Sequence, residues 1–223
     1  MKTKNRWVGL VFISMAISLV IIDGTIVNTI FPKVIEDLAL TSTEVQWVQE
    51  SYVLVFASTL LVWGSLADKI GRKRLLLIGI VIFIIASVWA GSTESAGEMI
   101  AARVVQGFGG AMVLPTTLSL VNANFQGKER GIAFAVWGAT IGGMVAVGPV
   151  LGGWLATDFT WRWAFLINLP LGILILAGLQ IADELSRLPE KSNQQDIRRV
   201  VIRKGRENYL CLLNLDEGLA QMP

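Results

Sequence analysis

Two charged side chains stand inside long apolar stretches of the chain, where a charge is costly and therefore points to a function. Asp23 lies about two-thirds of the way along the first apolar stretch, and Arg103 lies several residues inside a later one, with Gln106 one turn further on. A carboxylate or a guanidinium in hydrocarbon requires an opposite charge, backbone carbonyls or a water-filled cavity. We predict that Asp23 is functional and that Arg103 couples electrostatically to a titrating acid. The alternatives are that Asp23 reaches water at a helix end and that Arg103 extends outward to the membrane surface.

A second group of residues forms the segment from Gly64 to Arg74, which reads Gly-Ser-Leu-Ala-Asp-Lys-Ile-Gly-Arg-Lys-Arg. Gly64 permits the close approach of another helix, and Gly71 permits a sharp reversal between two antiparallel helices. Asp68 is predicted at the C-terminal end of a helix, where the dipole disfavours an anion, so it should find a cationic or N–H partner. The alternative is a generic basic loop.

A third group consists of small residues spaced four apart in a charge-free stretch. Gly138 and Gly142 form one such pair, and Gly148 and Gly152 form another, with Pro149 inside the second. This spacing predicts close contact with neighbouring helices, and the proline predicts a bend. We interpret this helix as one that packs at a domain interface and helps to decide which side of the protein is open.

These residues must be positioned by helices that cross a membrane. The chain has 223 residues, is 53% hydrophobic and only 16% charged, and has a mean hydropathy of +0.60. Soluble domains carry about 25% charged residues, and a membrane-spanning helix needs roughly 20 mostly apolar residues. The composition therefore predicts an all-α membrane protein with six spans. The predicted spans are Trp7–Ile30, Val45–Ala67, Leu75–Gly91, Met99–Val121, Gly131–Ala156 and Trp163–Ala182.

The basic residues between these spans predict the orientation of the chain. Cytoplasmic segments carry an excess of Lys and Arg, and Trp gathers at both membrane surfaces. With the N-terminus in the cytoplasm, nine basic residues fall on the inner side before the tail, whereas the outer loops hold only Lys33 and Arg162. Six tryptophans also lie near predicted helix ends. They are Trp7, Trp47, Trp89, Trp154, Trp161 and Trp163.

Several other classes of function have little support. The net charge of only +2 gives no basic footprint for nucleic acid. The single cysteine, Cys211, cannot form an internal disulfide, and neither a C-x-x-C pair nor any histidine is present as a metal ligand. The sequence shows neither a nucleophile–base pair nor a phosphate-binding loop, so nothing in it indicates an enzyme. If protons move through this protein, carboxylates must carry them.

Taken together, the motifs resemble those of the major facilitator superfamily, and specifically of its fourteen-span drug:proton antiporters. The Gly64–Arg74 segment matches the signature loop of the superfamily. The resemblance covers about residues 5–190, and four other stretches support it. These are Asp23-Gly-Thr-Ile-Val-Asn28 followed by Pro32, Arg103-Val-Val-Gln-Gly-Phe-Gly-Gly110, Gly138–Gly153, and Trp161-Arg-Trp163 with Asn168 and Pro170.

The resemblance implies a fold, a function and a set of roles. Residues 1–182 would form the six-helix N-terminal half of a major facilitator fold in the inner cell membrane. The family exports lipophilic, often cationic, molecules in exchange for protons, and it uses the proton gradient without a cofactor. Partners would be the lipid bilayer and a second six-span half or a second copy of the chain. Substrate or proton binding would fall to Asp23, Asn28, Arg103 and Gln106, and the gate to Gly64, Asp68, Gly71 and Arg72.

The segment 183–223 departs from the family pattern. It holds seven basic and seven acidic residues and no stretch long enough to span, so we predict a polar cytoplasmic tail. After Pro189 no family motif is found, which suggests a truncation or a frameshift near 190–198. Two hypotheses follow, a working half-antiporter and a non-transporting remnant that only interacts with intact carriers; an importer has less support. Glu50 is either a second titratable group or, as we favour, a solvated residue near a helix end.

Overall fold

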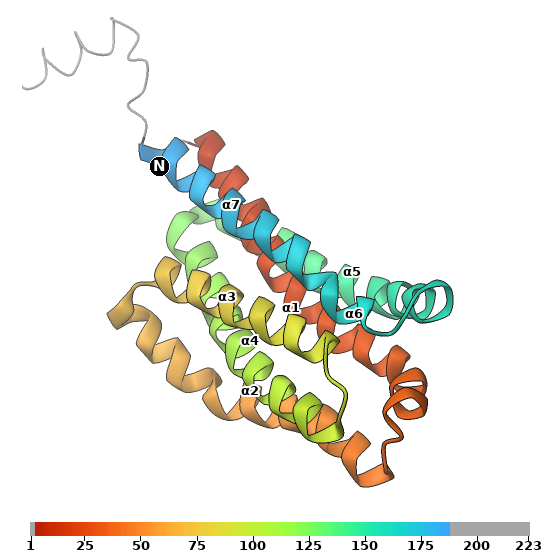
Figure 1. The fold of residues 1–223 in the computed structure, drawn as a ribbon. Coiled ribbons are helices and arrows are strands. Elements are labelled where there is room, and N and C mark those ends of the chain that lie inside the picture. The colour runs from red at the N-terminus through yellow and green to blue at the C-terminus, as the bar shows by residue number, and fades with distance from the viewer. Residues whose placement is uncertain (1–2, 188–223) are drawn as a thin grey trace, which may run out of the picture. The chain divides into compact units, whose positions relative to one another are not determined.

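The computed structural model describes residues 3–187, with side chains from residue 6 to residue 182 (Figure 1). Six of its helical stretches are long and apolar enough to cross a membrane, as the sequence predicts. The predictions for residues 188–223, including the origin of segment 191–223, lie outside the described residues. The helices are α1 Thr3–Leu38, α2 Ser42–Ile70, α3 Arg72–Gly91, α4 Ala96–Asn124, α5 Gly127–Asp158, α6 Trp163–Leu166 and α7 Asn168–Arg187.

Several helices are longer than the predicted spans. The first was expected to end at Ile30, but α1 continues past Pro32 to Leu38. A proline inside a helix removes one backbone donor, here the one that would reach the carbonyl of Asn28, and membrane helices tolerate such a loss. The helix α2 begins at a capping box, in which the Thr41 hydroxyl accepts from the Glu44 N–H and the Glu44 carboxylate accepts from the Thr41 N–H. Polar helix ends extend beyond the apolar stretches, so counting apolar residues underestimates their length.

The sixth span is divided into two helices. The helix α6 ends at Leu166, Ile167 forms a turn, and α7 begins at Asn168 and runs beyond the predicted end at Ala182. Pro170 has no N–H to donate to the carbonyl of Leu166, four residues earlier, so the α-helical ladder is interrupted at this point. Asn168, the first residue of α7, is fully buried.

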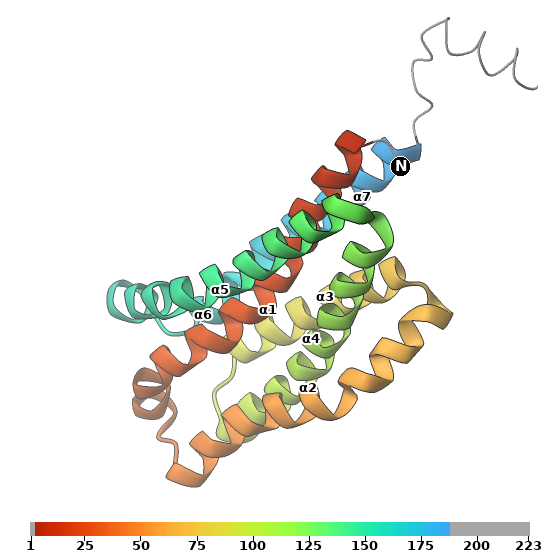
Figure 2. The same cartoon turned by 180° about the vertical axis from the view of Figure 1, so that it is seen from behind.

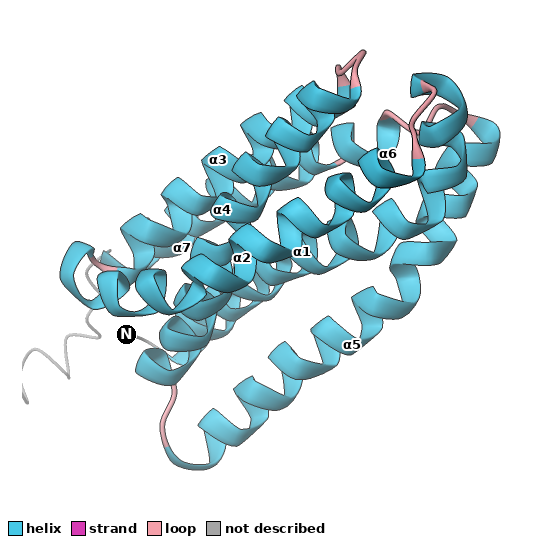
Figure 3. Ribbon diagram, turned by 90° about the horizontal axis from the view of Figure 1, so that it is seen from below, coloured by secondary structure: helices cyan, strands magenta, loops and turns pink. Residues whose placement is uncertain are grey.

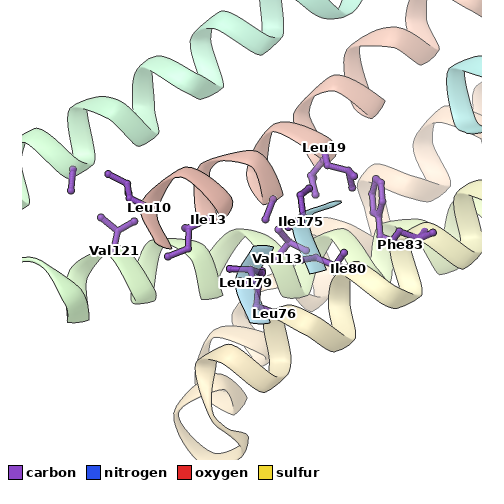
Figure 4. Close-up of a cluster of buried hydrophobic side chains, with 14 of the residues drawn as sticks. Leu10, Ile13, Leu19, Leu76, Ile80, Phe83, Val113, Val121, Ile175 and Leu179 are labelled. Carbon is purple, nitrogen blue, oxygen red and sulfur yellow. The ribbon is translucent and has the colours of Figure 1, made fainter. Parts of the chain in front are cut away.

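The helix α4 lies at the centre of one set of packed helices, because it contacts α2, α3 and α1. The helix α1 in turn packs along α5, which Figure 3 shows at the side of the bundle. Both Figure 1 and the view from behind in Figure 2 show α2 beside α4. A large apolar cluster holds α1, α3, α4 and α7 together (Figure 4). Its labelled members are Leu10, Ile13, Leu19, Leu76, Ile80, Phe83, Val113, Val121, Ile175 and Leu179.

Two of the long helices bury little of their surface within the described residues. Only 6% of the most apolar window of α2 and of α5 is buried, compared with 67% for α1. Large apolar side chains such as Leu61 and Val150 are therefore exposed on them. In a membrane protein such faces can contact lipid or another helical unit.

Candidate functional site

The intramembrane acid Asp23 lies at the centre of a buried hydrogen-bonded cluster. Its side chain is 0% exposed. Its Oδ2 accepts a hydrogen bond from Arg103 Nη1 at 2.7 Å, which also makes the two residues an ion pair. Its Oδ1 accepts from Gln106 Nε2 at 2.7 Å and from Asn168 Nδ2 at 2.9 Å. Three donors from α4 and α7 thus replace the water that the carboxylate of α1 would otherwise require.

Ser87 of α3 joins the two amides of this cluster. Its hydroxyl oxygen accepts from Gln106 Nε2 at 2.8 Å and from Asn168 Nδ2 at 3.2 Å, and the hydroxyl donates to the carbonyl of Phe83. Ser87 belongs to none of the sequence motifs and was not predicted as a site residue. The sequence marks Ser87 only weakly, as a small polar residue within a charge-free apolar span.

The guanidinium of Arg103 is also held by an aromatic ring. Its Cζ lies 4.1 Å from the centroid of the Tyr52 ring, a cation–π distance, and the side chain is 2% exposed. Two glycines of α4 explain why α2 comes so close. A Cβ on Gly107 would stand 2.5 Å from the Tyr52 carbonyl oxygen, and one on Gly110 would stand 3.2 Å from its hydroxyl. These glycines allow the backbone approach that places Tyr52 over Arg103.

The structure decides between the alternatives for the two buried charges and separates one predicted residue from them. Asp23 does not reach water at a helix end, and Arg103 pairs with it instead of extending outward. Asn28, in contrast, lies on an exposed part of α1, where its Oδ1 accepts from Gln49 Nε2 of α2 at 2.7 Å. The structure therefore brings Asp23, Arg103 and Gln106 together and places Asn28 elsewhere.

The loop between α2 and α3 has the features expected from its sequence. Gly71 adopts a φ of 104°, a conformation that favours glycine, and it joins the two helices directly. The carboxylate of Asp68 accepts from Arg72 Nε at 3.1 Å and from Arg72 Nη2 at 2.9 Å. Arg72 Nη1 also donates to the carbonyl of Ser119 in α4. The cationic partner predicted for Asp68 is thus Arg72, and the same guanidinium attaches the loop to α4.

The two glycine pairs of α5 have different surroundings. A Cβ on Gly148 would overlap the Thr25 side chain, and one on Gly152 would lie 3.1 Å from the Ile26 carbonyl oxygen, so this pair packs tightly on α1. Apart from the nearby backbone of α5 itself, no atom of the described chain lies within 4 Å of a Cβ built on Gly138 or Gly142. The close helix contact predicted for this first pair is therefore absent from the described part of the chain.

Two other predicted residues make ordinary contacts. A Cβ on Gly64 would lie 3.8 Å from Pro115 Cβ of α4, so α4 does approach α2 here, but a small side chain would also fit. Pro149 lies inside α5, which continues as a helix to Asp158. Neither residue has a polar side chain that could join the hydrogen-bonded cluster around Asp23.

A separate polar group lies where α1 ends. The carboxylate of Asp37 accepts from Trp161 Nε1 at 2.9 Å and from Arg162 Nη2 at 3.3 Å, while Arg162 Nη1 donates to the Thr93 carbonyl at 2.7 Å. An open hollow of about 550 Å³ adjoins this group and includes Glu36 in its lining. Its residues lie at helix ends and in a loop, away from the buried charges, so we place the candidate site at Asp23. Glu50 is exposed on α2.

The described structure thus defines a multi-span α-helical membrane protein with an ion pair buried among its helices. The family model of the Major Facilitator Superfamily matches residues 13–213. The chain belongs to this superfamily, which is a family of transporters and not of enzymes. The match confirms the family resemblance of the motifs, and the six membrane-length helices confirm the predicted fold.

Three relatives illustrate the similarity. The puromycin resistance protein pur8 of Streptomyces alboniger is 42% identical over 79% of this chain and 35% of its own length. The methyl viologen resistance protein SmvA of Salmonella typhimurium is 38% identical over 78% of this chain and 35% of its own. An uncharacterized MFS-type transporter of Mycobacterium tuberculosis is 37% identical over 96% of this chain and 37% of its own. The chain thus spans little more than a third of the length of these relatives.

A solved structure shows the same fold. A bacterial homolog of the human lysosomal transporter Spinster, in an inward-facing and unoccupied conformation, superposes with a TM-score of 0.67 at 19% sequence identity. The match covers 82% of this chain and 44% of that one. At this identity the likeness concerns the fold alone.

Proposed function

We propose that this chain is the proton-responsive half of a carrier that exports lipophilic or cationic small molecules in exchange for protons. The observation that carries the proposal is the fully buried ion pair between Asp23 and Arg103, which two side-chain amides complete. An ionisable pair inside a membrane is costly and usually marks an ion or substrate path. Support also comes from relatives named for resistance to puromycin and to methyl viologen.

The chemistry of the exchange follows from the charge balance of the pair. With Asp23 ionised, its negative charge neutralises the positive charge of Arg103, and the two side chains hold α1 against α4. A proton on Asp23 would cancel the attraction. The guanidinium would then keep the Gln106 carbonyl oxygen and the rings of Tyr52 and Phe165 as partners. The helices that carry these groups could then rearrange. A cationic substrate would compete with the proton for Asp23, because it would bind only when Asp23 is ionised.

The loop between α2 and α3 would act as a gate in this scheme. Arg72 bridges Asp68 and the Ser119 carbonyl, and thereby ties the end of α2 to α4. We place this loop on the cytoplasmic side, because the basic residues Lys69, Arg72 and Lys73 gather there. Opening the gate would require the end of α2 to move relative to α4.

Transport would require a second helical unit. Carriers of this kind alternate by rocking one bundle of helices against another. The exposed apolar faces of α2 and α5, with Gly138 and Gly142 uncovered, would meet that unit. The unit could be a separately encoded second half or a second copy of this chain.

The test is drug tolerance and proton-linked dye export in a drug-sensitive, efflux-deficient host. The chain is expressed alone and, in a second arm, together with the remaining C-terminal part of the puromycin resistance protein as a separate chain. Asp23→Asn should abolish export, whereas Glu36→Gln should not, because Glu36 is an exposed acid of the same helix.

Each outcome of this test has a definite meaning. Export in either arm that depends on Asp23 supports the proposal. Membrane insertion without export in both arms overturns it and favours a non-transporting protein that only interacts with intact carriers. Uptake of a substrate together with protons would instead indicate an importer.

A further inference from the structure

We infer that Asn168 is a positioning residue that serves both protonation states of Asp23. In the described state its amide donates a hydrogen bond to the carboxylate. After a half-turn of the amide, its carbonyl oxygen would accept the hydrogen bond of the carboxylic acid. The inference rests on the proposed function only in that Asp23 is taken as the group that gains and loses a proton.

The first observation is that Asn168 uses only half of its hydrogen-bonding capacity. Its Nδ2 donates to Asp23 Oδ1 at 2.9 Å and to Ser87 Oγ at 3.2 Å. Its Oδ1 is buried and has no hydrogen-bond partner in the described structure, although the residue is 0% exposed. Buried side-chain oxygens usually have a partner, so an acceptor left free beside an ionisable acid calls for an explanation.

The second observation is that the other amide of the cluster is fully used. Gln106 Oε1 accepts from Arg103 Nη1 at 2.6 Å, and Gln106 Nε2 donates to Asp23 Oδ1 and to Ser87 Oγ. Turning the Gln106 amide would remove the acceptor from Arg103 and place an N–H group against the guanidinium. Of the two amides that contact Asp23 Oδ1, only that of Asn168 can turn without losing an existing bond of its oxygen.

Protonation creates the need for such a turn. When Asp23 takes a proton from a hydronium ion, the carboxylate becomes a carboxylic acid and water is released. An O–H group on Oδ1 would then face the N–H groups of Gln106 and Asn168, which are donors and cannot accept it. The half-turn of Asn168 replaces its N–H with its carbonyl oxygen at this position. The acid thereby gains an acceptor, and the Ser87 hydroxyl keeps its bond from Gln106.

None of the charged groups around Asp23 can accept the hydrogen bond of its protonated carboxyl group, so an uncharged residue must do so. Arg103 of α4 and Tyr52 of α2 are the charged and titratable groups that face it. The charged residues of α3, α5 and α7 stand only near the ends of those helices, and α6 has none. The guanidinium of Arg103 has only donors and cannot accept a hydrogen bond from the carboxylic acid O–H. Asn168 also directly follows the turn at Ile167, so its side-chain amide would turn at the position where α7 begins.

The experiment is infrared difference spectroscopy of the purified full chain in lipid nanodiscs, between high and low pH. The C=O stretch of protonated Asp23 is the band that disappears in Asp23→Asn. In Asn168→Leu, which can neither donate nor accept, this band should shift to higher frequency because the acid loses a hydrogen-bond partner. Asn168→Ser retains a group that can do both and should restore most of the parent frequency. Asn28→Leu removes an amide outside the cluster and should leave the band unchanged.

A second measurement does not depend on the leucine variant folding. With asparagine carrying ¹³C in its side-chain carbonyl, the parent protein should show a shifted amide band between the two pH values, and Asn168→Ser should remove it. An Asp23 band that is unchanged in Asn168→Leu, the absence of an isotope-sensitive asparagine band, or the absence of any Asp23 band overturns the inference. No step of this measurement requires transport, so a failure of drug export counts against the proposed function alone.

Discussion

Arg103 donates a 2.7 Å hydrogen bond to the carboxylate of Asp23, 80 positions earlier in the chain, and both side chains are almost completely buried. The pair connects the middle part of α1 to the first third of α4. Because neither charge can be solvated where it stands, each depends on the other, and on the amides of Gln106 and Asn168, for its stability in the interior.

Removal of either charge from this pair should be costly, and removal of both should cost less than the two single losses added together. Asp23→Ala leaves a buried guanidinium without its anion and should lower the free energy of unfolding by about 3–5 kcal/mol. The double variant with Arg103→Ala should be less destabilised than the sum of the two single variants. Unfolding in detergent, followed by circular dichroism, measures the cycle. Additive effects would show that the two charges do not interact.

The two glycine pairs of α5 provide a matched comparison of packing. Gly148→Ala places a methyl group into Thr25 of α1 and should destabilise the protein by about 1–3 kcal/mol, the usual cost of overpacking. Gly138→Ala meets nothing in the described chain and should stabilise the helix by about 0.5–1 kcal/mol. Thermal unfolding of the two variants in one detergent gives the comparison. Equal effects would contradict the described α1–α5 contact.

The ring of Tyr52 should matter more than its hydroxyl group. Tyr52→Phe keeps the aromatic face over Arg103 and should retain most of the stability. Tyr52→Leu removes it and should cost about 0.5–2 kcal/mol for the cation–π interaction, in addition to the loss of packing. Denaturation midpoints of the two variants distinguish the contributions. If the phenylalanine variant were as unstable as the leucine variant, the hydroxyl and not the ring would be the stabilising group.

The ion pair between Asp68 and Arg72 should have little effect on stability. Its side chains are 65% and 37% exposed, and exposed pairs contribute at most about 1 kcal/mol. We therefore expect Asp68→Asn to unfold almost as the parent does, while it impairs the gating proposed for this loop. The control is Glu36→Gln, which removes an exposed pair with Lys33 on α1. Unfolding and dye export are measured on the same preparations, and a large loss of stability in Asp68→Asn would contradict a gating role.

The sequence alone determined the spans, the sharp turn and the polar residues of interest. Long apolar stretches fold as helices in a membrane because every backbone N–H and C=O group must be bonded within the segment. This is a local property, so six spans could be counted from the sequence. The turn at Gly71 and the pairing of Asp68 with a nearby cation are also local, since Asp68 and Arg72 are only four residues apart.

The tertiary structure decided which of the polar residues meet. Asn28 is five positions after Asp23, which turns it by about 140° around the helix, so it could not join the same cluster. Ser87 and Asn168 lie on α3 and α7, and no short-range pattern connects them to α1. The two glycine pairs of α5 have the same spacing, yet among the described residues only Gly148 and Gly152 pack against another helix. Such contacts depend on how the helices rotate and pack against each other. The sequence marked Asp23 as an isolated intramembrane acid. In the fold it belongs to a buried hydrogen-bonded cluster whose side chains come from four helices.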